Sequence, residues 1–260
     1  MATIPPVVPP LPSERRYARD LPPGSAFTWL RAGWQDLTTD PLPSLAYGVL
    51  VFLLSLAMVL GLALLEWDYV LFPALAGFLV FAPTLAIGLY VKSRGIERNE
   101  PVTLGQMIVP RAQSGAQIFF IGAMLCGLML LWMRAAVIIY ALFFGVRAFP
   151  GIDHIAPMLF TTPTGLVMLA IGTLVGGLFA AFSFAISAFS IPLLLDQRLD
   201  ALTAMGTSWA LVWNNLPAML VWGAIVLALF LLSLATGLLG LIVVFPLLGH
   251  ATWHAYRAVR

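Results

Sequence analysis

Six apolar stretches fill most of the chain after residue 42 and constrain its fold more than any other feature. An α-helix needs about 20 apolar residues to cross the hydrocarbon core of a bilayer. Membrane spans are therefore expected near residues 43–65, 69–91, 116–140, 164–194, 216–235 and 238–256. The last two share one apolar run that is too long for one crossing, which predicts a tight turn at Thr236 and Gly237. Because lipid cannot satisfy exposed backbone groups, the pattern predicts an all-α membrane protein.

The composition agrees with this class and argues against others. Hydrophobic residues make up 61% of the 260 residues and charged residues 9%, which is far from the composition of soluble domains. The net charge of +2 is too small to predict a nucleic-acid partner, so the lipid bilayer and other membrane proteins are the expected partners. The chain has no Walker sequence, GxSxG elbow or HExxH motif. We therefore expect no enzyme activity, no catalytic residues and no cofactor.

The distribution of Lys and Arg predicts the orientation of the spans, because cytoplasmic loops are enriched in these residues. With six spans, one side of the membrane would hold Arg15, Arg16, Arg19, Arg31, Lys92, Arg94, Arg98, Arg111, Arg198, Arg257 and Arg260. The opposite side would hold Glu66, Asp68, Arg147, Asp153 and His154, the last two in a solvated turn. Both termini are therefore expected in the cytoplasm. Residues 1–24, rich in proline and charge, are expected to be a disordered cytoplasmic tail, and 25–260 a single six-helix transmembrane domain.

A weak internal repeat precedes the spans, where interfacial amphipathic helices are predicted near 26–38, 102–112 and 201–213. The first and third carry apolar residues at the same helical spacing, which suits a helix lying on a membrane surface. The two sets are Phe27, Leu30, Trp34 and Leu37, and Leu202, Met205, Trp209 and Val212. The 102–112 segment is a degenerate copy with a candidate capping box in Thr103 and Gln106.

The second span of each hairpin carries a proline toward its cytoplasmic end, at Pro83, Pro192 and Pro246. A proline removes a backbone hydrogen bond and kinks its helix. The pattern predicts six transmembrane helices arranged as three degenerate repeats of an amphipathic helix plus a helical hairpin. Such repeats are common in transporters, whose sites lie at the repeat interface.

Alignment on these prolines brings two pairs of polar residues to equivalent positions. His250 and His254 stand four apart on one helix face, and Asp196 and Asp200 occupy the matching positions of the preceding repeat. Two imidazoles and two carboxylates are candidate ligands for Zn²⁺ or another divalent ion. A structural polar cluster is the favoured alternative, because Asp200 is a natural N-cap for a helix that begins at Ala201. Either hypothesis predicts His250 within direct or single-water hydrogen-bonding reach of Asp196.

Small residues recur at spacings of four along the fourth span, where they would let helices approach closely. They include Gly172, Gly176, Gly177, Ala180 and Ala181. Tight packing inside one bundle is the favoured interpretation, and a dimer interface or a small-molecule path are the alternatives. In the third span, the sequence leaves open whether residues 135–149 extend the helix or lie along the outer surface.

Four segments between residues 29 and 256 carry a family resemblance. They are WLRAGWQDL with PLPSLAYG after it, FAPTLAIGLYVKSRGIE, IPLLLDQRLDALTAMGTSWALVWNN, and PLLGHATWHAYR. With these segments the chain resembles the bacterial integral membrane proteins of domain-of-unknown-function family 2189. The resemblance implies a bacterial inner-membrane location and supplies no activity. Scarce charge within the spans favours a structural, accessory or assembly factor, and the alternative is a small transporter or channel with a site at the repeat interface.

Overall fold

The computed structural model describes residues 17–67, 70–110, 114–145 and 151–260, and within these ranges the chain is helical with no strands. The helices are α1 (Ser25–Thr39), α2 (Pro41–Leu64), α3 (Leu71–Leu85), α4 (Ile87–Glu97), α5 (Leu104–Ile108), α6 (Gly115–Phe144), α7 (Ile152–Thr161), α8 (Pro163–Ser187), α9 (Ser190–Asp196), α10 (Ala201–Asn214), α11 (Leu216–Ala235) and α12 (Leu241–Val259). For the described residues, the all-α prediction is confirmed.

Five helical stretches among the described residues are long and apolar enough to cross a membrane. They are Pro41–Leu64, Pro73–Glu97, Gly115–Phe144, Pro163–Asp196 and Leu216–Ala235. Each corresponds to one of the first five predicted spans. The sixth, predicted at 238–256, corresponds to α12, which is not among these candidates. The second half of α12 carries His250, His254 and Arg257, and these residues lower its apolar character.

The predicted proline kinks are found in part. Helix α8 gives way to α9 at Ala188 and Phe189, and Ala188 holds the carbonyl four residues before Pro192, with which a proline ring clashes. The second span is interrupted at Ala86, which follows Pro83 in the chain. A proline clashes with a carbonyl four residues before it, so this clash does not explain the interruption. In contrast, α12 is continuous through Pro246.

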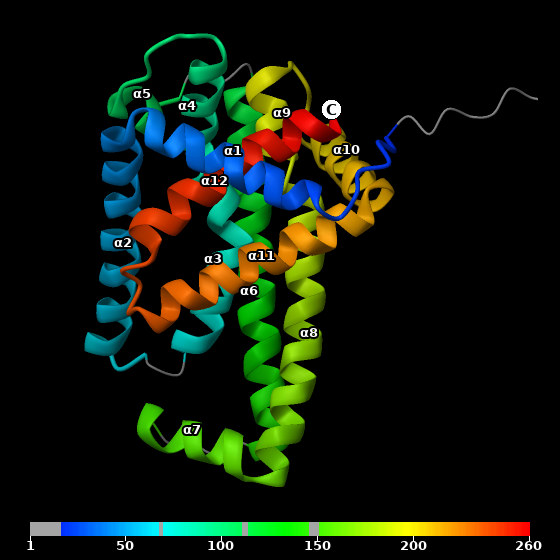
Figure 1. The fold of residues 1–260 in the computed structure, drawn as a ribbon. Helices are drawn as coiled ribbons and strands as arrows, with labels where there is room; N and C mark the ends of the chain where they lie inside the picture. The colour runs from blue at the N-terminus through cyan, green and yellow to red at the C-terminus, as the bar shows by residue number, and fades with distance from the viewer. Residues whose placement is uncertain (1–16, 68–69, 111–113, 146–150) are drawn as a thin grey trace, which may run out of the picture.

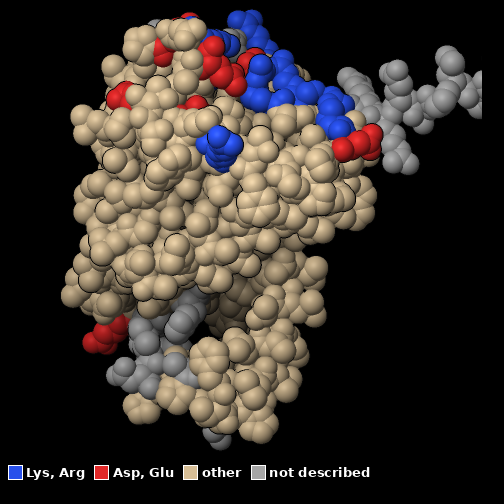
Figure 2. All heavy atoms as spheres, in the orientation of Figure 1, with Lys and Arg blue, Asp and Glu red and all other residues tan. Residues whose placement is uncertain are grey.

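The long helices α2, α6 and α8 run in similar directions, and shorter helices gather at their ends (Figure 1). Helix α1 lies across one end, where it contacts α12, α11 and α2, whereas α7 lies across the opposite end. The two ends of the described chain meet, because Arg19 Nη2 donates to the Arg260 carbonyl oxygen over 2.6 Å. Figure 2 shows Lys and Arg gathered at this same end, above a broad uncharged belt.

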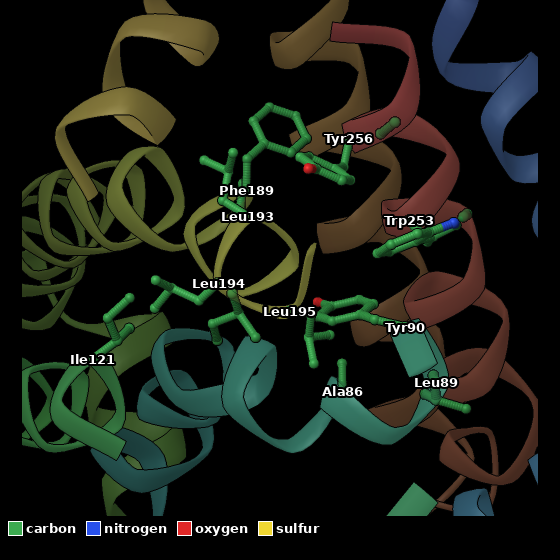
Figure 3. Close-up of a cluster of buried hydrophobic side chains, with 14 of the residues drawn as sticks. Ala86, Leu89, Tyr90, Ile121, Phe189, Leu193, Leu194, Leu195, Trp253 and Tyr256 are labelled. Carbon is green, nitrogen blue, oxygen red and sulfur yellow. The ribbon is translucent and has the colours of Figure 1, made fainter. Parts of the chain in front are cut away.

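Helix α12 lies at the centre of the packing and contacts α1, α2 and α4. Glycines make these close approaches possible: a Cβ atom on Gly33 would lie 2.6 Å from the Ala251 nitrogen, and one on Gly48 would lie 2.2 Å from the Ile242 carbonyl oxygen. In Figure 3, Trp253 and Tyr256 of α12 lie beside the buried side chains of α4 and α9. Much of the second half of α12, including His250, is therefore enclosed by protein, whereas Arg257 remains exposed.

The predicted amphipathic helices are all helical, although α5 is shorter than the predicted 102–112 segment, part of which lies outside the described residues. Its capping box between Thr103 and Gln106 is confirmed. Trp34 of α1 and Trp209 of α10, which align in the predicted repeat, are 50% and 41% exposed. Both tryptophans face the surroundings of the protein. Their contact with a membrane surface stays a prediction.

Three further segments can be compared with what the sequence predicted for them. Tyr17 and Arg19, at the end of the predicted tail, are held by hydrogen bonds to the side chain of Asn215, whereas residues 1–16 lie outside the described residues. Residues 135–144 extend α6, which settles that part of the open question about 135–149. The predicted turn around Asp153 and His154 is wrong, because this segment forms α7.

Candidate functional site

His250 is fully buried at the centre of a hydrogen-bonded group of polar side chains. Its Nδ1 atom lies 2.7 Å from Ser93 Oγ, and its Nε2 atom lies 2.9 Å from Ser44 Oγ. Ser93 Oγ also donates to Asp36 Oδ2 over 2.6 Å, and the same carboxylate oxygen lies 2.9 Å from His254 Nε2. Helices α1, α2, α4 and α12 each supply at least one of these side chains.

Lys92 extends the group on the other side of Ser44. Its ammonium group donates to Ser44 Oγ over 2.9 Å and to the Asp40 carbonyl oxygen, and it lies 3.8 Å from the Asp40 carboxylate. The Lys92 side chain is 2% exposed, so these acceptors replace the water that an ammonium group ordinarily keeps. We call the seven residues together the His250 network: Asp36, Asp40, Ser44, Lys92, Ser93, His250 and His254.

Counting donors and acceptors shows which atom donates and which accepts in each hydrogen bond at the centre of the network. A serine hydroxyl has one proton to donate, and Ser93 gives its proton to Asp36. The imidazole must therefore donate from Nδ1 to Ser93. Its Nε2 atom then accepts from Ser44, which in turn accepts from Lys92. A neutral His250 with its proton on Nδ1 satisfies every group, so the network is complete without a further ligand.

The predicted partner of His250, Asp196, lies in a different cluster. Its carboxylate accepts from the Tyr256 hydroxyl over 3.1 Å, is bonded by Arg260, and lies 3.9 Å from Arg98 Nη2. The expected approach of His250 to Asp196 is therefore wrong, because Ser44 and Ser93 occupy both imidazole nitrogens. The alignment could predict the depth of each residue in its helix, but not which neighbouring helix its face meets.

Asp200 acts as the predicted N-cap. Its side chain accepts a hydrogen bond of 2.9 Å from the Thr203 backbone nitrogen at the start of α10. Hydrogen bonds from the Thr203 side chain and backbone lower the pKa of Asp200, because they favour the carboxylate over the neutral acid. The capping interaction therefore accounts for Asp200 without a metal.

The four candidate metal ligands consequently fall into three places. His250 and His254 lie in the network, Asp196 lies among arginines, and Asp200 lies at the start of α10. Among the described residues, no group of three or more His, Cys, Asp or Glu side chains could hold a metal ion. Sequence reasoning did not identify the other five members of the network: Asp36, Asp40, Ser44, Lys92 and Ser93. Asp36 lies four residues before Asp40, a spacing like that of the two pairs that were found, and this was an available signal.

A pocket of about 420 Å³ lies beside Asp196. Its lining residues, which we call the arginine pocket, are Arg94, Glu97, Arg98, Asp196, Trp253 and Arg257. Arg94 Nη1 donates to the Leu195 carbonyl oxygen over 2.6 Å, and Arg257 Nε lies 3.5 Å from Glu97. Charged groups of both signs therefore surround this pocket, with arginines in excess.

A larger cavity of about 730 Å³ lies between α3, α6, α7 and α8. We call it the apolar cavity, because apolar and aromatic side chains and glycines dominate its wall and none of its described lining residues is charged. Trp132 of α6 crosses toward α3, where its Nε1 donates to the Pro73 carbonyl oxygen over 3.1 Å. The indole also packs on Gly176 of α8, where a Cβ atom would lie 2.8 Å from the ring.

The favoured prediction of tight packing fits the end of α8, where Ser183, Ala185 and Ser187 are buried, but not all of the glycines before it. Gly176 packs against Trp132, but Cβ atoms on Gly172 and Gly177 would meet no atom within 4 Å. In the apolar window of this span, 6% of the residues are buried within the protein. Most of α8 faces the surroundings or the apolar cavity, where Gly172, Gly176, Gly177 and Ala180 line the wall.

Comparisons with known proteins give one match. No curated protein and no solved structure matches the chain. A family model described as predicted integral membrane protein (DUF2189) matches residues 71–196. This range contains the segment FAPTLAIGLYVKSRGIE and begins and ends with candidate spans. Over residues 71–196, the chain is therefore similar to the predicted integral membrane proteins of domain-of-unknown-function family 2189.

Proposed function

We propose that this protein is a membrane-embedded accessory factor that holds the acyl chain of a lipid-like molecule in the apolar cavity. The cavity volume, about 730 Å³, carries the proposal. It falls within the range of ligand sites, about 300–1,000 Å³, and such sites are lined mainly by apolar and aromatic side chains. An uncharged wall of this kind favours an apolar occupant, because a polar solute would lose its hydrogen bonds to water there.

The size and surroundings of the cavity favour an acyl chain over a partner helix. Ten residues of helix, 15 Å long and about 10 Å wide, fill roughly 1,200 Å³, which exceeds the cavity. The cavity wall includes α6 and α8, in whose apolar windows 11% and 6% of the residues are buried within the protein. Most residues in these windows are therefore at least partly exposed, so a lipid chain could enter sideways from the bilayer.

The other end of the molecule supports an accessory role over the transport of a polar solute. A polar route would be favoured by a cavity lined by Asp196, His250 and the small residues of α8. Instead, His250 lies in a filled core whose polar groups satisfy one another. Movement of a polar solute past His250 would have to break this network.

A small transporter of apolar molecules is the second candidate, and the glycines in the cavity wall favour it. Gly172 and Gly177 leave open space next to α8. This space supports the small-molecule path, which is one of the alternatives that the sequence offers for these residues. Both candidates share the cavity and differ in whether its occupant crosses the bilayer. Transfer of a fluorescent fatty acid across proteoliposome membranes would distinguish them: catalysed transfer favours the transporter, and binding without transfer favours the accessory factor.

The proposal includes six crossings, with both termini in the cytoplasm of a bacterial inner membrane. The contact between Arg19 and Arg260 supports an even number of crossings, because an odd number would separate the two ends. With α12 as the sixth, the order of elements supports three repeats. Each would consist of a lead-in helix (α1, α5 or α10), a span (α2, α6 or α11) and a returning span (α3–α4, α8–α9 or α12).

Photocrosslinking tests the proposed ligand. A diazirine-bearing C16 fatty acid, added to the purified full-length protein, should label peptides that contain Trp132 and Gly176. Gly172→Phe should abolish this labelling, because the ring would fill open cavity space beside α8. The control is Gly223→Phe in α11, which also enters open space but does not line the cavity. Equal labelling of both variants, or labelling spread evenly over all spans, would refute the proposal.

A further inference from the structure

The arginine pocket lies where two candidate spans end. The second span ends at Glu97 and the fourth at Asp196, and both residues line the pocket together with Trp253 and Arg257 of α12. A pocket at the ends of transmembrane segments lies at the level of lipid headgroups. Figure 2 shows that Lys and Arg gather at this end of the molecule.

Positive charge prevails in the pocket. Three guanidinium groups, from Arg94, Arg98 and Arg257, face the carboxylates of Glu97 and Asp196. One positive charge therefore remains. Outside the pocket lining, Arg260 adds a positive charge beside Asp196, and Glu100, whose charge acts on Arg94, offsets it. Guanidinium groups match the geometry of phosphate oxygens and bind them with paired hydrogen bonds. The charge balance thus favours an anion with several oxygens.

Two further features suit a bound headgroup. The pocket volume, about 420 Å³, exceeds that of a small ion. Arg98 and Arg257 are 54% and 47% exposed, so they can approach a ligand without leaving a buried position. Trp253 also lines the pocket, although its Nε1–H group is enclosed by protein.

We infer that the arginine pocket binds the phosphate group of an anionic phospholipid headgroup. Basic pockets between transmembrane helices bind such headgroups on the cytoplasmic side of membranes, and this pocket lies between α4, α9 and α12. The site is separate from the apolar cavity, because the two share no lining residue. The inference therefore does not depend on the proposed function.

Native mass spectrometry of the delipidated full-length protein tests this site with phosphatidylglycerol as the probe and phosphatidylcholine of the same acyl chains as the control lipid. Arg98→Gln and Arg257→Gln should each weaken phosphatidylglycerol binding about fivefold, the effect of one basic residue at a lipid surface. Arg31→Gln is the matched control, because it removes an exposed arginine of α1 that does not line the pocket. Its binding should equal that of the wild type.

The Glu97→Gln variant distinguishes an effect on lipid binding from an effect on folding. This change removes a negative charge from the pocket, so it should strengthen phosphatidylglycerol binding about fivefold, and loss of folding could not produce that result. Equal binding of the two lipids, or equal weakening by Arg31→Gln, would overturn the inference. Inorganic phosphate is added as a competitor at millimolar concentration. If it displaces phosphatidylglycerol completely, a soluble phosphate ligand replaces the headgroup and the inference is wrong.

Discussion

Replacement of His250 by alanine tests the His250 network most sharply. The imidazole is fully buried and bonds Ser44 and Ser93 on helices α2 and α4. His250→Ala removes two hydrogen bonds, worth about 1 kcal/mol each, and leaves a cavity of the kind that costs about 2–5 kcal/mol on large-to-small changes. Because Ser44 and Ser93 keep Lys92 and Asp36 as partners, we expect the total loss to lie at the lower end of the sum of these terms, at about 4–5 kcal/mol.

Thermal unfolding in detergent measures this loss. For a chain of this size each kcal/mol shifts Tm by about 2–4 °C, so His250→Ala should lower Tm by roughly 8–20 °C. His154→Ala is the matched control, because His154 lies exposed in α7 and most such changes stay within about 0.5 kcal/mol. Ser93→Ala combined with His250→Ala should cost less than the sum of the single changes, since the residues are in contact. Equal Tm values for His250→Ala and His154→Ala would refute the reasoning.

Three further predictions concern helix packing, the cap at Asp200 and the topology of the spans. Gly48→Ala should destabilise the protein by about 1–3 kcal/mol through overpacking, because the new Cβ would lie 2.2 Å from the Ile242 carbonyl oxygen. The control, Gly206→Ala in α10, has open space around it and should be neutral or slightly stabilising. A lower Tm for Gly206→Ala than for Gly48→Ala would exclude the close packing of α2 against α12. Asp200→Ala should lower Tm at neutral pH, and the difference from wild type should shrink as pH falls through the lowered pKa of Asp200, because a protonated carboxyl loses the charge that Thr203 stabilises; a pH-independent difference would contradict the charged cap. Reporter fusions after Arg260 and at Glu66 should report cytoplasm and periplasm respectively, and a C-terminus outside would contradict the six-span proposal.

Features that depend on local sequence could be predicted. The apolar stretches place the first five spans close to their observed ends, and the turn at Thr236 and Gly237 is confirmed, since α11 ends at Ala235 and Gly237 has φ of +62°. The capping roles of Thr103 and Asp200 are also confirmed, because an N-cap bonds residues within one turn.

Features that depend on contacts between distant helices could not be predicted. Ser44 and His250 are separated by 206 positions, and Ser93 and His250 by 157. Helical spacing shows which residues share a face but not which helix covers that face. In α1, for example, the buried face includes Trp29, Gly33 and Asp36, whereas Phe27 and Trp34 of the predicted stripe are exposed. The lack of a side chain at Gly33 lets α12 pack closely against this face of α1. A single sequence does not reveal that contact.

The most direct test of the proposed function is a density map of the full-length protein in lipid nanodiscs. The proposed function predicts elongated density between α3 and α8, in contact with Trp132 and Gly176, the two residues that pack together in the cavity wall. The same map should show the His250 core without such density. A map in which protein side chains close the apolar cavity and no ligand density lies beside Trp132 and Gly176 would contradict the proposal.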